Sequence, residues 1–171
     1  MYILKKAVII FIIFFSFSNV YGQWNFKTIN NGFDEPFKKA FTASNNKGYL
    51  TMEFGEPLYT KESRINRPFL ALNGFYFCDE NADIDFNFNV NGKNSNYKLH
   101  AIKSKDSEMY YFDESIWDEE FTRDFKNAQK CSIRVVQYYC KDIYYQFNFS
   151  KSTSAYNFIV NEENPQFKEK Q

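Results

Sequence analysis

The sequence is poor in the side chains from which most catalytic and metal sites are built. It has one histidine, His100, and three cysteines among 171 residues. A zinc site or a histidine-based triad would therefore have to be built around His100 alone. The chain also has no Cys-x-x-Cys pair, no Gly-x-Ser-x-Gly motif and no glycine-rich phosphate loop. We expect no cofactor, and we expect His100 to be a strand residue that faces water.

Neither sign of charge is in excess, which removes the usual basis for binding nucleic acid. Lysine and arginine total 21, as do aspartate and glutamate, so the formal net charge is zero. Proteins that bind nucleic acid carry a basic surface that displaces counterions from the phosphates. The composition therefore predicts no nucleic-acid partner.

Long apolar runs are missing, although a short one lies near the N-terminus. Residues 7–15 are nine consecutive apolar residues that follow Lys5 and Lys6, whereas a membrane-spanning helix needs about 20. The run ends in Val-Tyr-Gly at Gly22, which is typical of a secretory signal peptide over residues 1–22. An uncleaved anchor is the alternative. No cysteine lies near the junction, so a lipid anchor is not indicated.

Cleavage after Gly22 would make the mature protein secreted or periplasmic. It would remove two lysines and no acid, leaving 19 basic and 21 acidic side chains and a net charge of −2. The rest of the chain has no apolar run long enough to span a membrane, so we expect a soluble protein without a transmembrane anchor. Residues 23–160 suit one domain, and residues 161–171 are polar and predicted to fray.

Aromatic side chains are abundant, with 21 Phe, 13 Tyr and 2 Trp, and they favour strands. Apolar and polar residues alternate most clearly over residues 83–90, as in a strand with one buried face. Asn91-Gly92 then predicts a tight hairpin turn into a strand over residues 97–102. Further strands are expected at residues 24–28, 37–44, 49–54, 68–78, 131–139 and 143–149, with a turn at 45–48 and a short hairpin loop at 79–82.

Residues 118–130 have helical periodicity instead. Ser115 followed by Asp118 resembles a capping box, and acids crowd the first turn, where the helix dipole favours them. Residues 154–160 are expected to form a short closing helix. The apolar face of the first helix consists of Phe121, Phe125 and Ala128.

These elements predict a mainly β protein. We expect an antiparallel β-sandwich or flattened barrel of about eight strands with one or two short helices. A three-residue loop between the strands at 131–139 and 143–149 keeps Arg134 in solvent, whereas a two-residue loop would place it on the apolar face.

The three-residue loop would set Tyr138 and Tyr144 opposite each other on the outer face of the sheet. This pair is the candidate binding site, because exposed tyrosines stack on ligands or seat a protein partner. The alternatives are that the helix covers the two rings or that they only stabilise the hairpin.

The cysteines are Cys78, Cys131 and Cys140, and export would permit a disulfide. Cys131 and Cys140 lie near the two ends of one predicted strand, roughly 30 Å apart and too far to bond. A bridge would therefore join Cys78 to Cys131 or Cys140. Three buried free thiols are the alternative.

From residue 79 to residue 85, every second side chain carries an oxygen atom that could bind a metal ion. This spacing is typical of the first half of a calcium-binding loop. The pattern then fails, because Ile84 replaces the glycine at position six and Val90 replaces the glutamate at position twelve. We therefore expect a polar loop and no metal site. The weak candidate ligands are Asp79, Asn81, Asp83 and Asp85.

Residues 84–160 resemble the invasion-associated locus B proteins, which are exported bacterial β-sandwich domains. The similarity lies in the order of a strand, the Asn-Gly turn, a returning strand, the helix DESIWDEEFTRDFKNAQK, the hairpin CSIRVVQYYCKDIYYQFNF and the closing segment STSAYNFIV. The family's cysteine arrangement is not kept. The resemblance implies an exported, non-enzymatic protein linked to the cell envelope or to host contact, and it carries over no functional residue.

The sequence thus favours an exported protein that binds a protein or a surface ligand without catalysis. A small secreted hydrolase that uses acidic residues is one alternative, although no spacing singles out a carboxylate pair. An inhibitor or accessory protein of an exported enzyme is another. Clustered carboxylates with perturbed pKa in a deep cleft would favour the hydrolase.

Overall fold

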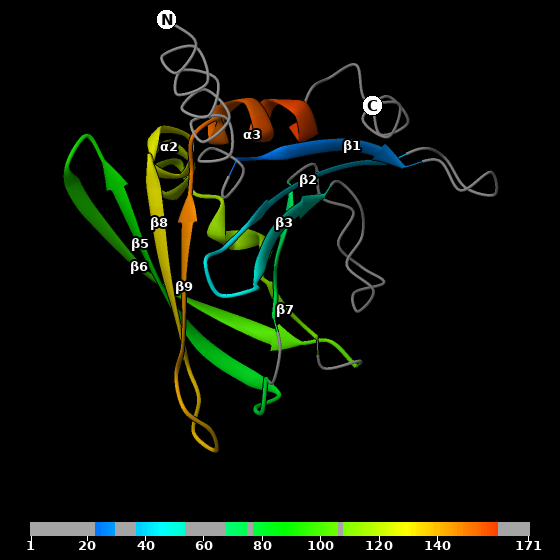
Figure 1. Ribbon diagram of the computed structural model, residues 1–171, viewed down its shortest axis with the longest axis vertical. Helices are drawn as coiled ribbons and strands as arrows, with labels where there is room; N and C mark the ends of the chain where they lie inside the picture. The colour runs from blue at the N-terminus through cyan, green and yellow to red at the C-terminus, as the bar shows by residue number, and fades with distance from the viewer. Residues whose placement is uncertain (1–22, 30–36, 54–67, 75–76, 106–107, 161–171) are drawn as a thin grey trace, which may run out of the picture.

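The computed structural model describes residues 23–29, 37–53, 68–74, 77–105 and 108–160 (Figure 1). The predicted signal peptide over residues 1–22 and the predicted polar tail over residues 161–171 both lie outside the described residues. Among the described helices, none has the length and apolar character needed to cross a membrane.

Within the described residues, nine strands form one antiparallel sheet in the order β1-β2-β3-β4-β7-β6-β5-β8-β9. The mainly β, antiparallel fold predicted from the sequence is confirmed, with nine strands where about eight were expected, and the sheet is not closed into a barrel. The strands are β1 (Asn25–Ile29), β2 (Phe37–Ala43), β3 (Tyr49–Glu53), β4 (Phe69–Asn73), β5 (Asn81–Val90), β6 (Lys93–Lys103), β7 (Met109–Phe112), β8 (Lys130–Val136) and β9 (Ile143–Asn148).

The sheet bends back on itself, so that its two ends approach each other (Figure 1). The turn after β2 lies against β9, where Ser44 forms an isolated bridge with Phe147. Asn45 exchanges two hydrogen bonds with the backbone of Gln146, at 3.0 and 3.1 Å. These contacts cover part of the β9 edge, which would otherwise offer unpaired backbone groups to another chain.

Two helices cover the enclosed face of the bent sheet. Helix α3 (Ser152–Val160) contacts β1, β2 and β3, while α2 (Glu119–Asn127) contacts β5 and α3 (Figure 1). A short 3₁₀ turn, η1 (Glu114–Ile116), precedes α2. Both predicted helices are therefore present.

Helix α2 starts at an aspartate cap and buries the face that the sequence predicted. The Asp118 side chain accepts a hydrogen bond from the N–H of Phe121 at 2.7 Å, which satisfies one of the free N–H groups of the first turn. The predicted capping box is wrong, because Ser115 lies in η1 and its N–H is bonded by Asp113. Phe121, Phe125 and Ala128 are all buried.

The core is largely aromatic. Alternate residues of β5 point inward, so Ile84, Phe86 and Phe88 are buried. Phe88 contacts both Phe121 and Phe125 of α2, with ring centroids 5.3 and 6.0 Å apart. Such tilted and edge-on pairs match the ring quadrupoles and add to the free energy of burial.

One predicted hairpin is confirmed and another is wrong. Val90 pairs with Lys93 across the two-residue turn Asn91-Gly92, and both turn residues have positive φ, as a type I′ turn requires. Residues 79–82 do not close a hairpin, because β4 pairs with β3 and β7, whereas β5 pairs with β6 and β8. Strand β7 lies between β4 and β6 in the sheet. It has only four residues, and the sequence pattern did not predict it.

The hairpin of β8 and β9 keeps the predicted faces but not the predicted loop. Val135, rather than Tyr139, lies opposite Ile143, and residues 137–142 form the connection. The register differs by four residues, an even number, so each side chain stays on its predicted face. Val135 and Tyr145 are buried, whereas Arg134 is on the outer surface and bonded to Asp85.

Candidate functional site

Residues 137–142, which connect β8 to β9, project from one end of the sheet, and we call them the tyrosine loop. Cys140 in this loop forms a disulfide with Cys78, which lies between β4 and β5, and the two Cα atoms are 6.2 Å apart. This is one of the two pairings that the sequence left open. The bond ties the loop to a segment 62 residues away in the chain.

Hydrogen bonds fix the tyrosine loop on both sides of the disulfide. The Gln137 side chain accepts from the N–H of Cys78 at 2.8 Å and donates to the carbonyl of Lys141 at 2.9 Å. The N–H of Gln137 is bonded by the Asp142 carboxylate at 3.3 Å. Gln137 is itself buried, so these bonds are partly shielded from competing water.

A buried aspartate holds the next residue of the loop. The Asp79 carboxylate accepts a hydrogen bond from the N–H of Tyr138 at 2.7 Å. Its own backbone carbonyl accepts the hydroxyl of Tyr110 at 2.7 Å. Burial raises the pKa of Tyr110 to about 12, so that hydroxyl keeps its proton at physiological pH.

The fixed loop presents two adjacent tyrosines to solvent. Tyr138 and Tyr139 are each 89% exposed, the highest values among the exposed large apolar side chains of the described residues. Large aromatic rings are usually at least partly covered, because covering them removes apolar surface from water. Their exposure on a loop with a disulfide and several hydrogen bonds marks this end of the molecule as the candidate site.

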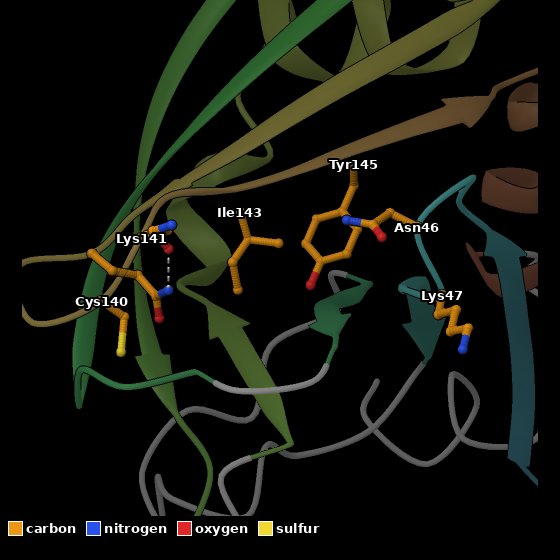
Figure 2. Close-up of a pocket in the computed structure, with 7 residues that line it drawn as sticks. Asn46, Lys47, Cys140, Lys141, Ile143 and Tyr145 are labelled. Atoms are coloured by element: carbon orange, nitrogen blue, oxygen red, sulfur yellow. Dashed lines mark hydrogen bonds between the residues drawn. The ribbon is translucent and has the colours of Figure 1, made fainter.

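A cavity of about 600 Å³ opens on one side of the tyrosine loop (Figure 2). We call it the basic cavity, because its charged lining residues, Lys47 and Lys141, are both lysines. Asn46 and Gln137 add amide groups, and Ile143, Tyr145 and Cys140 complete the lining.

Tyr145 forms the inner wall of this basic cavity. Its ring lies against Gly48 and Gly74, where an added Cβ atom would collide with it, so glycine is needed at both positions for this close approach. Burial raises the pKa of Tyr145 to about 12, so the phenol stays neutral.

A second cavity of about 640 Å³ lies beside the tyrosine loop, with Cys78 of the disulfide in its wall. Both exposed tyrosines of the loop contribute to its wall, together with Cys78, Asp79, Glu80 and Asn81. We call it the acidic cavity, because its charged lining residues, Asp79 and Glu80, are both carboxylates. Residues of the tyrosine loop thus line both a basic and an acidic cavity.

The predicted pairing of Tyr138 with Tyr144 is wrong. Strand β8 ends at Val136, so Tyr138 belongs to the loop, and Arg134 is the residue opposite Tyr144. Tyr144 is 59% exposed on the outer face of β9. The sequence therefore identified two exposed tyrosines but missed Tyr139, and it named Asp79 only as a weak candidate metal ligand. The disulfide that creates the loop joins segments far apart in the chain.

The weak candidate metal ligands are not brought together. Asp79 precedes β5, Asn81 begins it, and Asp83 and Asp85 point to its outer face. Asp83 forms an ion pair with Lys98 at 3.0 Å and lies 3.6 Å from the Nδ1 atom of His100, and the hydrogen bond from Lys98 lowers the pKa of Asp83. Among the described residues, no group of three or more His, Cys, Asp or Glu side chains could hold a metal ion.

Cys131 is not suited to act as a nucleophile. Cys78 and Cys140 are bonded to each other, which leaves Cys131 with a free thiol. The thiol is buried in the core, and burial raises its pKa well above the ordinary value. The reactive thiolate is therefore disfavoured, and Cys131 serves as a small apolar side chain.

Asp124 on α2 is a buried carboxylate that the sequence analysis did not identify. It accepts hydrogen bonds from Tyr97 at 2.8 Å and from the Nε of Arg123 at 2.9 Å. Burial alone would raise its pKa, but the hydrogen bonds, led by the one from Arg123, outweigh burial and lower it. This cluster locks α2 to β6 and lies away from the tyrosine loop.

The chemistry of the tyrosine loop indicates what kind of role it can have. Two exposed aromatic rings, a basic cavity and an acidic cavity suit the binding of another molecule more readily than a bond-breaking step. No family model, curated protein or solved structure matches this chain.

Proposed function

We propose that this protein is an exported, non-enzymatic binding protein whose partner docks on the tyrosine loop. The observation that carries the proposal is the exposure of Tyr138 and Tyr139 on a loop held by the Cys78–Cys140 disulfide. Tyrosine is among the residues that contribute most to the free energy of binding at protein interfaces.

The restraint of the loop supports the proposal. A mobile loop loses conformational entropy when it binds, which weakens its affinity, whereas a loop fixed beforehand avoids most of that loss. The disulfide and the hydrogen bonds made by Gln137 and Asp79 provide this restraint. A protein partner fits best, because two adjacent rings beside cavities of opposite charge match a surface of mixed chemistry.

The hydrolase alternative receives less support. A general acid needs a carboxyl group whose pKa is raised toward neutrality. Among the described residues, each carboxyl group with a shifted pKa, namely Asp83, Asp113 and Asp124, has it lowered. An inhibitor or accessory protein of an exported enzyme is a special case of docking, and the restrained loop suits that role equally.

Export is the second part of the proposal. A disulfide such as Cys78–Cys140 persists in oxidising compartments and is rare in the cytosol. The signal peptide over residues 1–22 and the resemblance of residues 84–160 to the invasion-associated locus B proteins point the same way. Mass spectrometry of the exported form should give a chain that begins at Gln23, whereas a product retaining Lys5 and Lys6 would contradict cleavage.

Docking on the loop is tested by titrating fluorescently labelled protein onto intact cells of the producing organism and onto its exported proteins. We expect the double variant Tyr138→Ala/Tyr139→Ala to bind at least about tenfold more weakly than the wild type, because it removes two interface anchors. The matched control is Phe26→Ala/Tyr49→Ala, which removes two exposed rings elsewhere and should change affinity less than about twofold. Equal binding by the loop variant, or no binding by the wild type, would contradict the proposal.

A further inference from the structure

We infer that the acidic cavity beside the tyrosine loop binds a guanidinium group, supplied by an arginine side chain of the docking partner. This inference rests on the proposed docking function and names the chemistry that the loop recognises. It is carried by one buried carboxylate with an unused oxygen and by two exposed aromatic rings in the wall of the same cavity.

Asp79 provides the buried negative charge. The residue is only 7% exposed, and its Oδ2 atom accepts the N–H of Tyr138. Its Oδ1 atom is buried and has no hydrogen-bond partner among the described residues. A buried carboxylate oxygen without a donor carries an uncompensated desolvation cost, so a cation that enters the cavity would be stabilised there.

Glu80 adds a second negative charge at the mouth of the cavity. It lines the same cavity as Asp79 and is exposed to solvent. Two adjacent negative charges raise the local concentration of cations and disfavour anions. The site therefore selects for positive charge before any direct contact is made.

Tyr138 and Tyr139 provide the aromatic walls. Both line the cavity, and both expose most of their surface. The face of a tyrosine ring attracts a cation placed over it. Carboxylates beside aromatic rings suit a flat cation that can stack on a ring and donate hydrogen bonds from its edge at the same time.

These requirements favour arginine over lysine. The guanidinium group is planar, stacks on aromatic rings and donates up to five hydrogen bonds, whereas an ammonium group is compact and strongly hydrated. Two lysines lie near this site, and both are already bonded. Lys103 donates to the carbonyls of Phe77 and Cys78 at 3.3 and 3.4 Å, and Lys98 pairs with Asp83 at 3.0 Å. Neither lysine donates to the Asp79 carboxylate, so its buried Oδ1 atom keeps its charge without a hydrogen-bond donor among the described residues.

The basic cavity, which is lined by Cys140 of the same disulfide, gives the site a direction. Lys47 and Lys141 line that cavity and would repel a guanidinium group. A partner arginine would therefore be bound on the side of Asp79 and Glu80, and acidic groups of the partner would lie toward the lysines. Complementarity of this kind fixes the orientation of a partner.

The test uses a blocked arginine, Nα-acetyl-arginine N-methylamide, titrated into the full-length protein and followed by the backbone amide signals in NMR. We expect saturable shifts at residues 79–81 and 138–139. The matched probe is the blocked citrulline, which has nearly the same shape without the charge, and it should bind at least about tenfold more weakly. Equal shifts with both probes, or no saturable shift at these residues, would overturn the inference.

Variants separate charge from structure. Asp79→Asn keeps an oxygen that accepts the N–H of Tyr138 but removes the charge, and it should weaken arginine binding at least about tenfold. Glu120→Gln removes an exposed acid on α2 and should leave binding unchanged. If Asp79→Asn does not fold, the exposed Glu80→Gln takes its place, with an expected loss of about threefold. Unchanged affinity in whichever of the two variants is tested would overturn the inference.

The two proposals fail in different ways. If Tyr138→Ala/Tyr139→Ala abolishes docking on cells while Asp79→Asn leaves both docking and arginine binding intact, the docking function stands and arginine recognition is wrong. If arginine binds in the acidic cavity but the tyrosine double variant docks normally, the cavity exists and the docking function is wrong.

Discussion

At the scale of single residues, Phe125 of α2 packs against β5 and against Phe149, which directly follows β9. Its ring contacts Trp24, Phe88, Trp117 and Phe149, with centroid distances between 5.0 and 6.0 Å. The side chain is fully buried. Truncation would leave a cavity that its rigid aromatic neighbours cannot fill.

We therefore predict that Phe125→Ala lowers the free energy of unfolding by about 3–5 kcal/mol. Phe26→Ala is the control, because Phe26 is 42% exposed on the edge strand β1, and it should cost less than about 1 kcal/mol. Urea denaturation followed by tryptophan fluorescence measures both. If Phe125→Ala lowered the free energy of unfolding by as little as the control is expected to, Phe125 would not be a core residue.

Asp124 gives the protein an acid-sensitive contact. Its pKa is lower in the folded protein than the ordinary value of 3.8, so its ionised form favours folding. The resulting stability is present above the unfolded pKa and is lost as the pH falls through the folded pKa. The protein should therefore lose the stability contributed by Asp124 below about pH 4.

The variant Asp124→Asn should be less stable than the wild type at neutral pH, because the ion pair with Arg123 is gone. Between about pH 5 and pH 2 the wild type should lose stability more steeply than the variant, so the difference between them narrows. Melting temperatures measured across this range provide the comparison. Parallel pH profiles would show that Asp124 has no lowered pKa in the folded state.

At the scale of elements, period-two alternation in β8 determines which side chains reach the core. Val135 is buried and Val136 is only partly buried, although the two are adjacent. We predict that Val135→Asp unfolds the protein, since an unpaired charge would be buried, and that Val136→Asp is mild. Circular dichroism melts compare the two, and the opposite ranking would mean that β8 has slipped by one residue.

Patterns within one segment were predictable, and pairings between segments were less so. The turn at Asn91-Gly92 and the apolar face of α2 follow from neighbouring residues, and both are present in the structure. β7 was missed because four residues are too few to show a period. The β8–β9 loop was predicted three residues too short, because Cys140 and Gln137 bind Cys78, a contact that no local pattern contains.

Exposed residues of the candidate site were predictable from local alternation, but their distant partners were not. Tyr138 and Tyr144 were expected outside because alternation excluded them from the core, and both are exposed. Asp79 accepts a hydrogen bond from the N–H of Tyr138, and Cys78 is bonded to Cys140 of the same loop. These two residues lie 59 and 60 positions before Tyr138 in the chain. A site made by such distant contacts is visible only once the sheet order is known.

At the scale of the whole molecule, the Cys78–Cys140 disulfide joins the segment before β5 to the loop after β8. Closing a loop of 62 residues restricts the unfolded chain, which typically stabilises the folded state by about 2–4 kcal/mol. We predict a loss of this size in Cys78→Ser/Cys140→Ser, measured by urea denaturation. A loss below about 0.5 kcal/mol would show that the bridge does not constrain the protein.

The central claim is that the tyrosine loop is a platform fixed before any partner arrives. Backbone ¹⁵N relaxation at the amides of Tyr138 and Tyr139 tests it most directly, since order parameters near 0.85 mark a rigid backbone and values below about 0.6 a flexible one. We predict values near 0.85 in the oxidised protein, similar to those of β8, and a marked fall once the disulfide is reduced. Values below about 0.6 in the oxidised protein would contradict the account.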